Sequence, residues 1–111
     1  MQISFETRDA EALPLRAFVE QRVRLVLRRL QPLVKRARVA LADVNGPRGG
    51  LDKRCQVELQ TSAGTVWITS LASDCRAALE GALSRAVRLV ARLTQRRRAR
   101  ERRRLSPQLQ S

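Results

Sequence analysis

The chain has 111 residues, of which 23 are basic and 10 acidic, and it contains no His and only two Cys. This length predicts one compact domain, and without His neither His-based acid–base catalysis nor a conventional zinc site is expected. No apolar run reaches the roughly 20 residues that span a bilayer, and the first residues lack the pattern of a secretory signal. We therefore expect a cytoplasmic protein with no metal, no cofactor, no small-molecule substrate and no membrane partner.

The first 32 residues predict a strand followed by a helix. Residues 2–8 alternate, with Ile3 and Phe5 on the apolar face, which is typical of a strand. From 13 to 30 the apolar period becomes helical, and Pro32 ends the segment. The apolar stripe of this helix consists of Leu15, Phe18, Val19, Val23, Val26, Leu27 and Leu30.

Three further strands are predicted at 36–44, 53–61 and 65–71. Residues 45–50 are rich in Gly and lack the Gly-Lys-Ser/Thr ending of a phosphate-binding loop, so we interpret them as a hairpin connection. The fourth strand is ambiguous, since either of its two faces could point to the core, and we expect Trp67 to be buried or half-buried. The predicted inward residues of the second and third strands are Ala37, Val39, Leu41, Cys55, Val57 and Leu59. The two candidate inward sets of the fourth strand are Val66 with Ile68, and Trp67 with Thr69 and Leu71.

A second helix follows Ser73 and Asp74, which are good N-cap residues. Its apolar positions repeat at helical spacing: Leu79, Ala82, Leu83, Ala86, Val90 and Leu93. The order strand, helix, three strands, helix predicts an α+β fold, a β-α-β-β-β-α two-layer sandwich whose four-stranded sheet carries both helices on one face. We expect this domain to cover residues 1–95 and residues 96–111 to form a disordered, Arg-rich extension.

The two Cys residues and the acidic residues give no sign of a reactive centre. Cys55 and Cys75 fit no metal-binding spacing, and two Cys make no disulfide framework. We expect both to be small buried hydrophobic residues. Asp43, Asp52 and Asp74 are scattered along the chain without paired-carboxylate spacing, so we predict no catalytic residue.

The net charge of +13 is divided between the predicted domain, at +7, and residues 96–111, at +6. Four arginines of the last helix follow one another at spacings of three, four and four, and no acid occurs from Ser84 to Arg100. Such a stripe repels itself when free and is stabilised by phosphates lying against it. The candidate RNA-binding residues are Arg85, Arg88, Arg92 and Arg96 of the last helix, with Arg22, Arg24, Arg28 and Arg29 of the first.

Two helices that each carry an Arg edge on one side of a sheet are expected to form a basic groove or ridge. The chain has two Phe, one Trp and no Tyr, so it lacks the exposed rings on which single-strand readers stack bases. Recognition of folded RNA through shape and phosphate position is therefore favoured.

Four sequence pieces, in this order and spacing, carry a family resemblance over residues 1–96. They are Met1-Gln2-Ile3, the run from Leu15 to Glu20, the run from Asp43 to Cys55, and Ser73-Asp74 followed by Ala77-Ala78-Leu79-Glu80. Together they resemble short ribosome hibernation-promoting factors, the family that includes the ribosome-associated inhibitor A proteins.

The resemblance implies the same β-α-β-β-β-α order and binding to the small ribosomal subunit and its rRNA, where messenger and transfer RNA would sit. It also implies silencing of translation, with ribosome pairing in resting or stressed cells. We expect the free protein to be a monomer. The positions matching the basic residues of the family are Arg22, Arg28, Arg85, Arg88 and Arg92. The chain departs from the family at Arg76, where Tyr is common, at residues 7–10, where some members have a His-containing loop, and in its Arg-rich extension.

Two other interpretations stay open at this stage. A stand-alone module that binds double-stranded RNA or the nucleoid would also pair a sheet with two helices and use a basic tail. A modulator of an acidic protein partner would fit the same basic surface.

Overall fold

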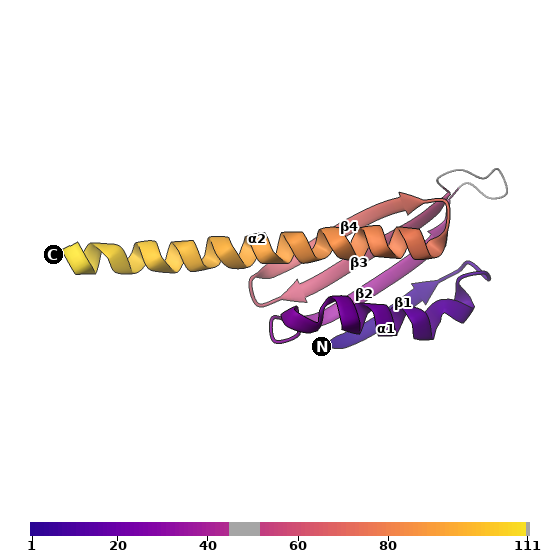
Figure 1. Cartoon of the computed structure of the whole chain (residues 1–111), viewed down its shortest axis with the longest axis horizontal. Coiled ribbons are helices and arrows are strands. Elements are labelled where there is room, and N and C mark those ends of the chain that lie inside the picture. Colours follow the sequence, from indigo (N-terminus) through magenta and orange to yellow (C-terminus); the bar gives the residue numbers. More distant parts are fainter. Residues whose placement is uncertain (45–51, 111) are drawn as a thin grey trace.

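The computed structural model describes residues 1–44 and 52–110, apart from the side chains of 106–110. The predicted hairpin connection at 45–50 lies outside the described residues. The elements follow the predicted β-α-β-β-β-α order, so the predicted α+β fold class is confirmed (Figure 1). Their bounds are β1 (Gln2–Thr7), α1 (Arg16–Val26), β2 (Val34–Asp43), β3 (Lys53–Thr61), β4 (Gly64–Ala72) and α2 (Cys75–Gln110), with short 3-10 turns η1 (Leu13–Leu15) and η2 (Arg28–Leu30) beside α1.

The four strands form one mixed sheet in the order β1-β2-β3-β4. β1 and β2 are parallel, and the crossover that a parallel pair requires contains α1. β2, β3 and β4 are antiparallel neighbours, and the register sets Val39 opposite Val57 and Val57 opposite Ile68. These apolar residues therefore form continuous rows across one face of the sheet.

Both helices cover that apolar face, α1 over β1 and α2 over β3 and β4 (Figure 1). No helix of the described residues covers the other face, which we call the open face. The predicted inward residues of β2 and β3 are buried, which confirms their assignment. In β4 the core side chains are those of Val66 and Ile68. The side chain of Trp67 points to the open face opposite Glu58 and is 70% exposed, so the prediction that Trp67 is buried or half-buried was wrong.

The first predicted helix is shorter than its apolar pattern. Periodicity predicted one helix over 13–30, whereas the α-helical part covers Arg16–Val26 and a 3-10 turn lies at each end. Pro14 lies within η1, and at the other end the N–H of Leu27 closes the helix on the carbonyl of Val23. Tight 3-10 turns satisfy carbonyls that a helix end leaves free, so the apolar stripe extends past the α-helix itself.

The second helix begins at the predicted cap, where Oδ1 of Asp74 accepts the N–H of Ala77 at 2.8 Å. Its apolar stripe packs on the sheet, with Leu79, Leu83 and Val90 fully buried. The structure continues this helix to Gln110, past the predicted boundary at residue 95, and its last part projects beyond the sheet (Figure 1). The division of the chain into residues 1–95 and 96–111 stays a prediction. Within the described residues, no helix combines the length and apolar content that crossing a bilayer requires.

Candidate nucleic-acid interface

The α2 arginine stripe, which we define as Arg85, Arg88, Arg92 and Arg96, is exposed to solvent at all four positions. Arg85 holds the stripe next to β4, because its Nη1 donates a hydrogen bond to the carbonyl of Thr69 at 2.9 Å. Arg85, Arg88 and Arg92 line one shallow hollow together with Ile68 and Leu89. The helix has therefore gathered three of the predicted residues on its β4 side, and Arg96 follows one turn later.

Within residues 1–44 and 52–105, no acidic side chain neutralises the charge of this stripe. Among the described residues, no carboxylate lies within ion-pair distance of the four guanidinium groups. Guanidinium groups offer planar pairs of donors that suit phosphate oxygens. An exposed row of them without internal counter-charges is a surface to which a chain of phosphates can bind.

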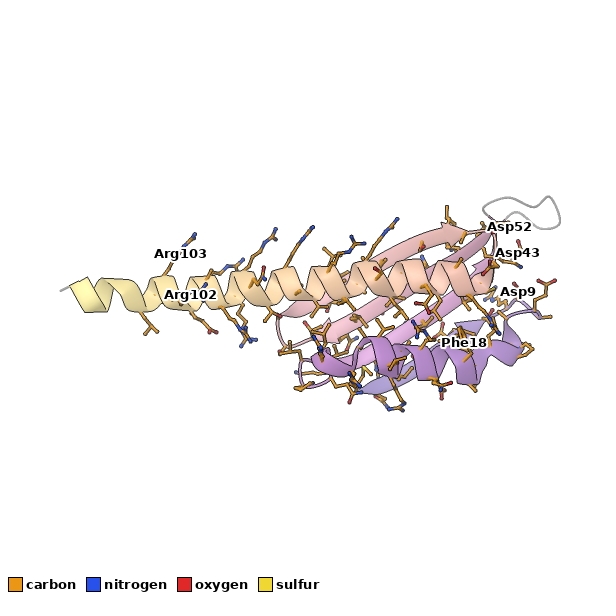
Figure 2. The ribbon with its side chains drawn as sticks, viewed as in Figure 1. Asp9, Phe18, Asp43, Asp52, Arg102 and Arg103 are labelled. Atoms are coloured by element: carbon orange, nitrogen blue, oxygen red, sulfur yellow. The ribbon has the colours of Figure 1, made fainter. Side chains whose placement is uncertain are left out.

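Arg22 has a different environment. Its Nε and Nη2 donate to the two carboxylate oxygens of Glu80, at 2.5 and 2.8 Å, so that it links α1 to α2. This hydrogen-bonded pair raises the pKa of Arg22, against an opposing effect of burial. The guanidinium of Arg76 on α2 lies 4.7 Å from the ring centroid of Phe18, a residue that Figure 2 shows on the side of α1 next to α2. Arg22 thus joins the two helices, and its predicted contact with RNA stays a prediction.

The arginines of α1 and those of the α2 arginine stripe do not form one continuous site. Arg22 meets Glu80 on the flank of α2 that faces α1, whereas Arg85 reaches β4 on the other flank. Arg24, Arg28 and Arg29 are exposed on α1 and η2, in the same helical layer. The structure therefore brings together the arginines of α2, and it leaves those of α1 as a second basic area.

Two anchoring bonds were not predicted from the sequence. Arg85 binds the carbonyl of Thr69, and Nη1 of Arg97 donates to the carbonyl of Ser62 at 2.8 Å. Both bonds tie α2 to the β3–β4 hairpin. Every residue has a carbonyl, so no sequence pattern marks which one an arginine will reach.

Asp9, Asp43 and Asp52 lie together at the end of the sheet near the start of α2 (Figure 2). There Nζ of Lys53 lies 3.0 Å from Asp9 and 3.3 Å from both Glu11 and Asp43. The hydrogen bond to Asp9, with smaller contributions from Asp43 and Glu11, raises the pKa of Lys53 despite its burial. The ammonium group lies among these carboxylates, so the cluster ties the connection after β1, which holds Asp9 and Glu11, to β2 and β3. It is not the candidate interface.

The two thiols are buried, as predicted. Cys55 is completely enclosed and Cys75 is nearly so, and both are free. Burial raises the pKa of Cys55 to about 12 and also raises the pKa of Cys75. Reactive thiols need a lowered pKa and access to solvent, so these two side chains belong to the core.

Comparisons with known proteins support the fold. No protein-family model matches the chain, and no curated protein matches it. Among solved structures, the crystal structure of the Thermus thermophilus Protein Y N-terminal domain matches with a TM-score of 0.67 and 24% sequence identity. The match covers 83% of this chain and 98% of that domain. At this level of identity the match shows a shared fold.

Proposed function

We propose that this protein binds the small ribosomal subunit and silences translation there, with the α2 arginine stripe lying against rRNA phosphates. The exposed stripe, which has no carboxylate partner among the described residues, carries the proposal. Its support is the match in fold to the Protein Y domain, together with the sequence resemblance to hibernation factors. The action requires binding alone and no chemical step.

The form of recognition follows from the residue types on the surface. Arginines in a row bind the regularly spaced phosphates of a folded RNA, and phosphate contacts fix position without reading sequence. One exposed aromatic side chain, Trp67, lies on the open face of the sheet, on the side opposite the helices. The α2 arginine stripe therefore recognises RNA through charge and shape.

The sequence resemblance also suggests where on the ribosome the protein binds and how binding stops translation. In that family the bound factor occupies the path of messenger and transfer RNA, so binding excludes both. We propose that this protein is a monomer when free, that it occupies the same place in the cytoplasm, in stationary phase or under stress, and that it promotes ribosome pairing. Arg24, Arg28 and Arg29 form the second contact area, and Arg22 contributes through its bridge to α2.

The decisive experiment reverses charge at two positions of the stripe. Arg85 is left intact because it anchors α2 to β4. The variant Arg88→Glu with Arg92→Glu is compared with a control of equal charge, Lys35→Glu with Arg36→Glu, whose residues are exposed on β2. We expect the stripe variant to lose co-sedimentation with small subunits at physiological salt. The control should retain most of it, and both variants should unfold near the temperature of the parent.

A second measurement separates this proposal from a general double-stranded-RNA or nucleoid-binding module. Affinity for purified small subunits and for a perfect RNA duplex is measured at the same salt concentrations. Tight binding to subunits and weak binding to the duplex would support specific binding to the ribosome. Equal affinities would support the general module, and retained subunit binding by the stripe variant would remove the α2 stripe from the mechanism.

A further inference from the structure

The last part of α2 extends past the rest of the molecule (Figure 1). We define residues 96–110 as the arm; at a rise of 1.5 Å per residue it is about 22 Å long. At its start the arm is linked to the body by the hydrogen bond that Arg97 donates to the carbonyl of Ser62, at the β3–β4 turn. Leu93, one turn before the arm, is the last residue of α2 that packs against the core. The side chains of residues 96–105 are exposed, apart from the half-buried Ala99, so this part of the arm is available to a partner.

The arginines of the arm surround the helix instead of forming a stripe. At 100° per residue, the seven of them leave no arc wider than about 100° without a positive charge. In Figure 2, Arg102 and Arg103 lie on different sides of the helix. The one acid, Glu101, is paired with Arg97 at 3.4 Å. The seven are Arg96, Arg97, Arg98, Arg100, Arg102, Arg103 and Arg104.

This distribution indicates the shape of the partner. A helix with one cationic side satisfies its charges on a flat row of phosphates, as proposed for Arg85 to Arg96. A helix that is cationic all round leaves half of its charges unsatisfied on such a surface. A cleft with phosphates on both walls satisfies them on every side, and an α-helix with its side chains needs an opening of about 10–12 Å.

We propose that the arm inserts lengthwise into a phosphate-walled cleft of folded RNA, and that this insertion stabilises its helix. The inference rests on the proposed function, because the arm continues the same helix that carries the α2 arginine stripe. Regular A-form RNA has a major groove that is too narrow for a helix, so the cleft is a widened groove or a junction between RNA helices. Repulsion among the arginines opposes the helix in the free protein, and phosphates on both sides remove that repulsion.

The test uses full-length protein with three neutralised arm arginines, Arg98→Gln, Arg100→Gln and Arg103→Gln. Glutamine keeps a long side chain and a good helix propensity. The control carries the same loss of charge elsewhere, as Arg8→Gln, Lys35→Gln and Arg36→Gln. Affinity for purified small subunits is measured from 50 to 300 mM salt. Each lost phosphate contact lowers the slope of log affinity against log salt by about 0.7–0.9, so we expect the arm variant to lose about two units and the control less than one.

A second readout follows the helix itself. Amide hydrogen exchange of residues 98–104 is compared in the free protein, with small subunits, with a perfect RNA duplex and with an acidic protein such as poly-glutamate. We expect strong protection with subunits and little with the other two. Equal slopes for arm variant and control, or equal protection by duplex or poly-glutamate, would overturn the cleft inference. A parent protein that does not bind subunits at all would instead contradict the proposed function.

Discussion

Arg22 and Arg88 have the same side chain and different surroundings. Arg22 donates two hydrogen bonds to Glu80 and joins the helices, whereas Arg88 is exposed beside a hollow that it shares with two other arginines. Binding RNA through Arg22 would require exchanging a bidentate carboxylate for a phosphate, with little net gain. Binding through Arg88 replaces only water and counterions. We therefore expect charge reversal at Arg88 to affect RNA binding more than removal of charge at Arg22.

At the scale of single residues, the raised pKa of Cys55 leads us to expect that the free energy of unfolding falls at alkaline pH. Its pKa of about 12 in the folded protein lies above the usual value of 9.0, because burial disfavours the thiolate. Above pH 9 the unfolded chain ionises and the folded chain does not, so the folded state binds more protons and its stability falls as pH rises. By pH 10 the loss attributable to Cys55 is about 1.4 kcal/mol.

The measurement is denaturant unfolding at pH 7, 9 and 10 for the parent and for Cys55→Ala. The substitution leaves a small cavity and lowers stability at every pH, so the difference between pH values is the informative quantity. We expect the variant to lose about 1.4 kcal/mol less than the parent between pH 7 and 10. The raised pKa of Lys53 acts in the same direction at higher pH in both proteins and cancels in this comparison. Parallel pH profiles would contradict the prediction.

Because the side chain of Trp67 lies on the open face of the sheet, we expect its replacement to have little effect on stability. Trp67 is the chain's single Trp and is 70% exposed, so its fluorescence should peak near that of hydrated indole and be quenched readily by iodide. Trp67→Thr should change the free energy of unfolding by less than about 1 kcal/mol. The matched substitution Ile68→Thr, one residue further on the buried face, should cost about 2 kcal/mol or more. Equal costs would mean that the two faces of β4 are wrongly assigned.

At the scale of elements, the start of α2 depends on one side chain. Asp74 accepts the N–H of Ala77, a donor that has no partner within the helix. Asp74→Ala should therefore destabilise the protein by about 1 kcal/mol, within the usual range for a lost N-cap. Ser73→Ala, at the neighbouring position, is the control and should cost less. Chemical denaturation at neutral pH measures both, and a larger effect at Ser73 would assign the cap to the wrong residue.

The sequence was sufficient to predict the elements because their apolar periods are regular. Alternation in β2 and β3 identified the buried residues, and the spacing from Leu79 to Val90 identified the inner face of α2. The orientation of β4 could not be predicted, since its two faces are similarly apolar and only pairing with β3 decides between them. The break of the first helix into α1 and 3-10 turns was missed for a related reason, because apolar spacing does not register the hydrogen-bond pattern.

Less of the candidate interface could be predicted. Spacing along one helix brought Arg85, Arg88 and Arg92 together correctly, since residues three and four apart share a face. The partner of Arg22 is 58 positions away in the sequence, and no local pattern indicates such a distance. Whether an arginine is available to RNA or engaged within the protein depends on packing between elements, which periodicity does not describe.

At the scale of the whole molecule, the two ends of α2 have different sources of stability. The first half is buried against the sheet, while the arm has three like-charged pairs at i,i+4 spacing: Arg96 with Arg100, Arg98 with Arg102 and Arg100 with Arg104. Each such pair costs roughly 0.2–0.5 kcal/mol, and the exposed Arg97–Glu101 pair returns about as much as one of them costs. The body should therefore stay folded under conditions in which the free arm opens.

Limited trypsin digestion tests this difference, because trypsin cleaves after arginine and both the body and the arm contain arginines. Cleavage requires local opening of the chain, and its rate follows the stability of the segment that opens. In the free protein we expect the first cuts within residues 96–104, leaving a resistant fragment that holds the sheet, α1 and the first half of α2. Bound small subunits should slow these cuts, because phosphates stabilise the arm. First cuts in the body, such as after Arg24 on α1, or arm cleavage that subunits do not slow, would contradict the proposed role of the arm.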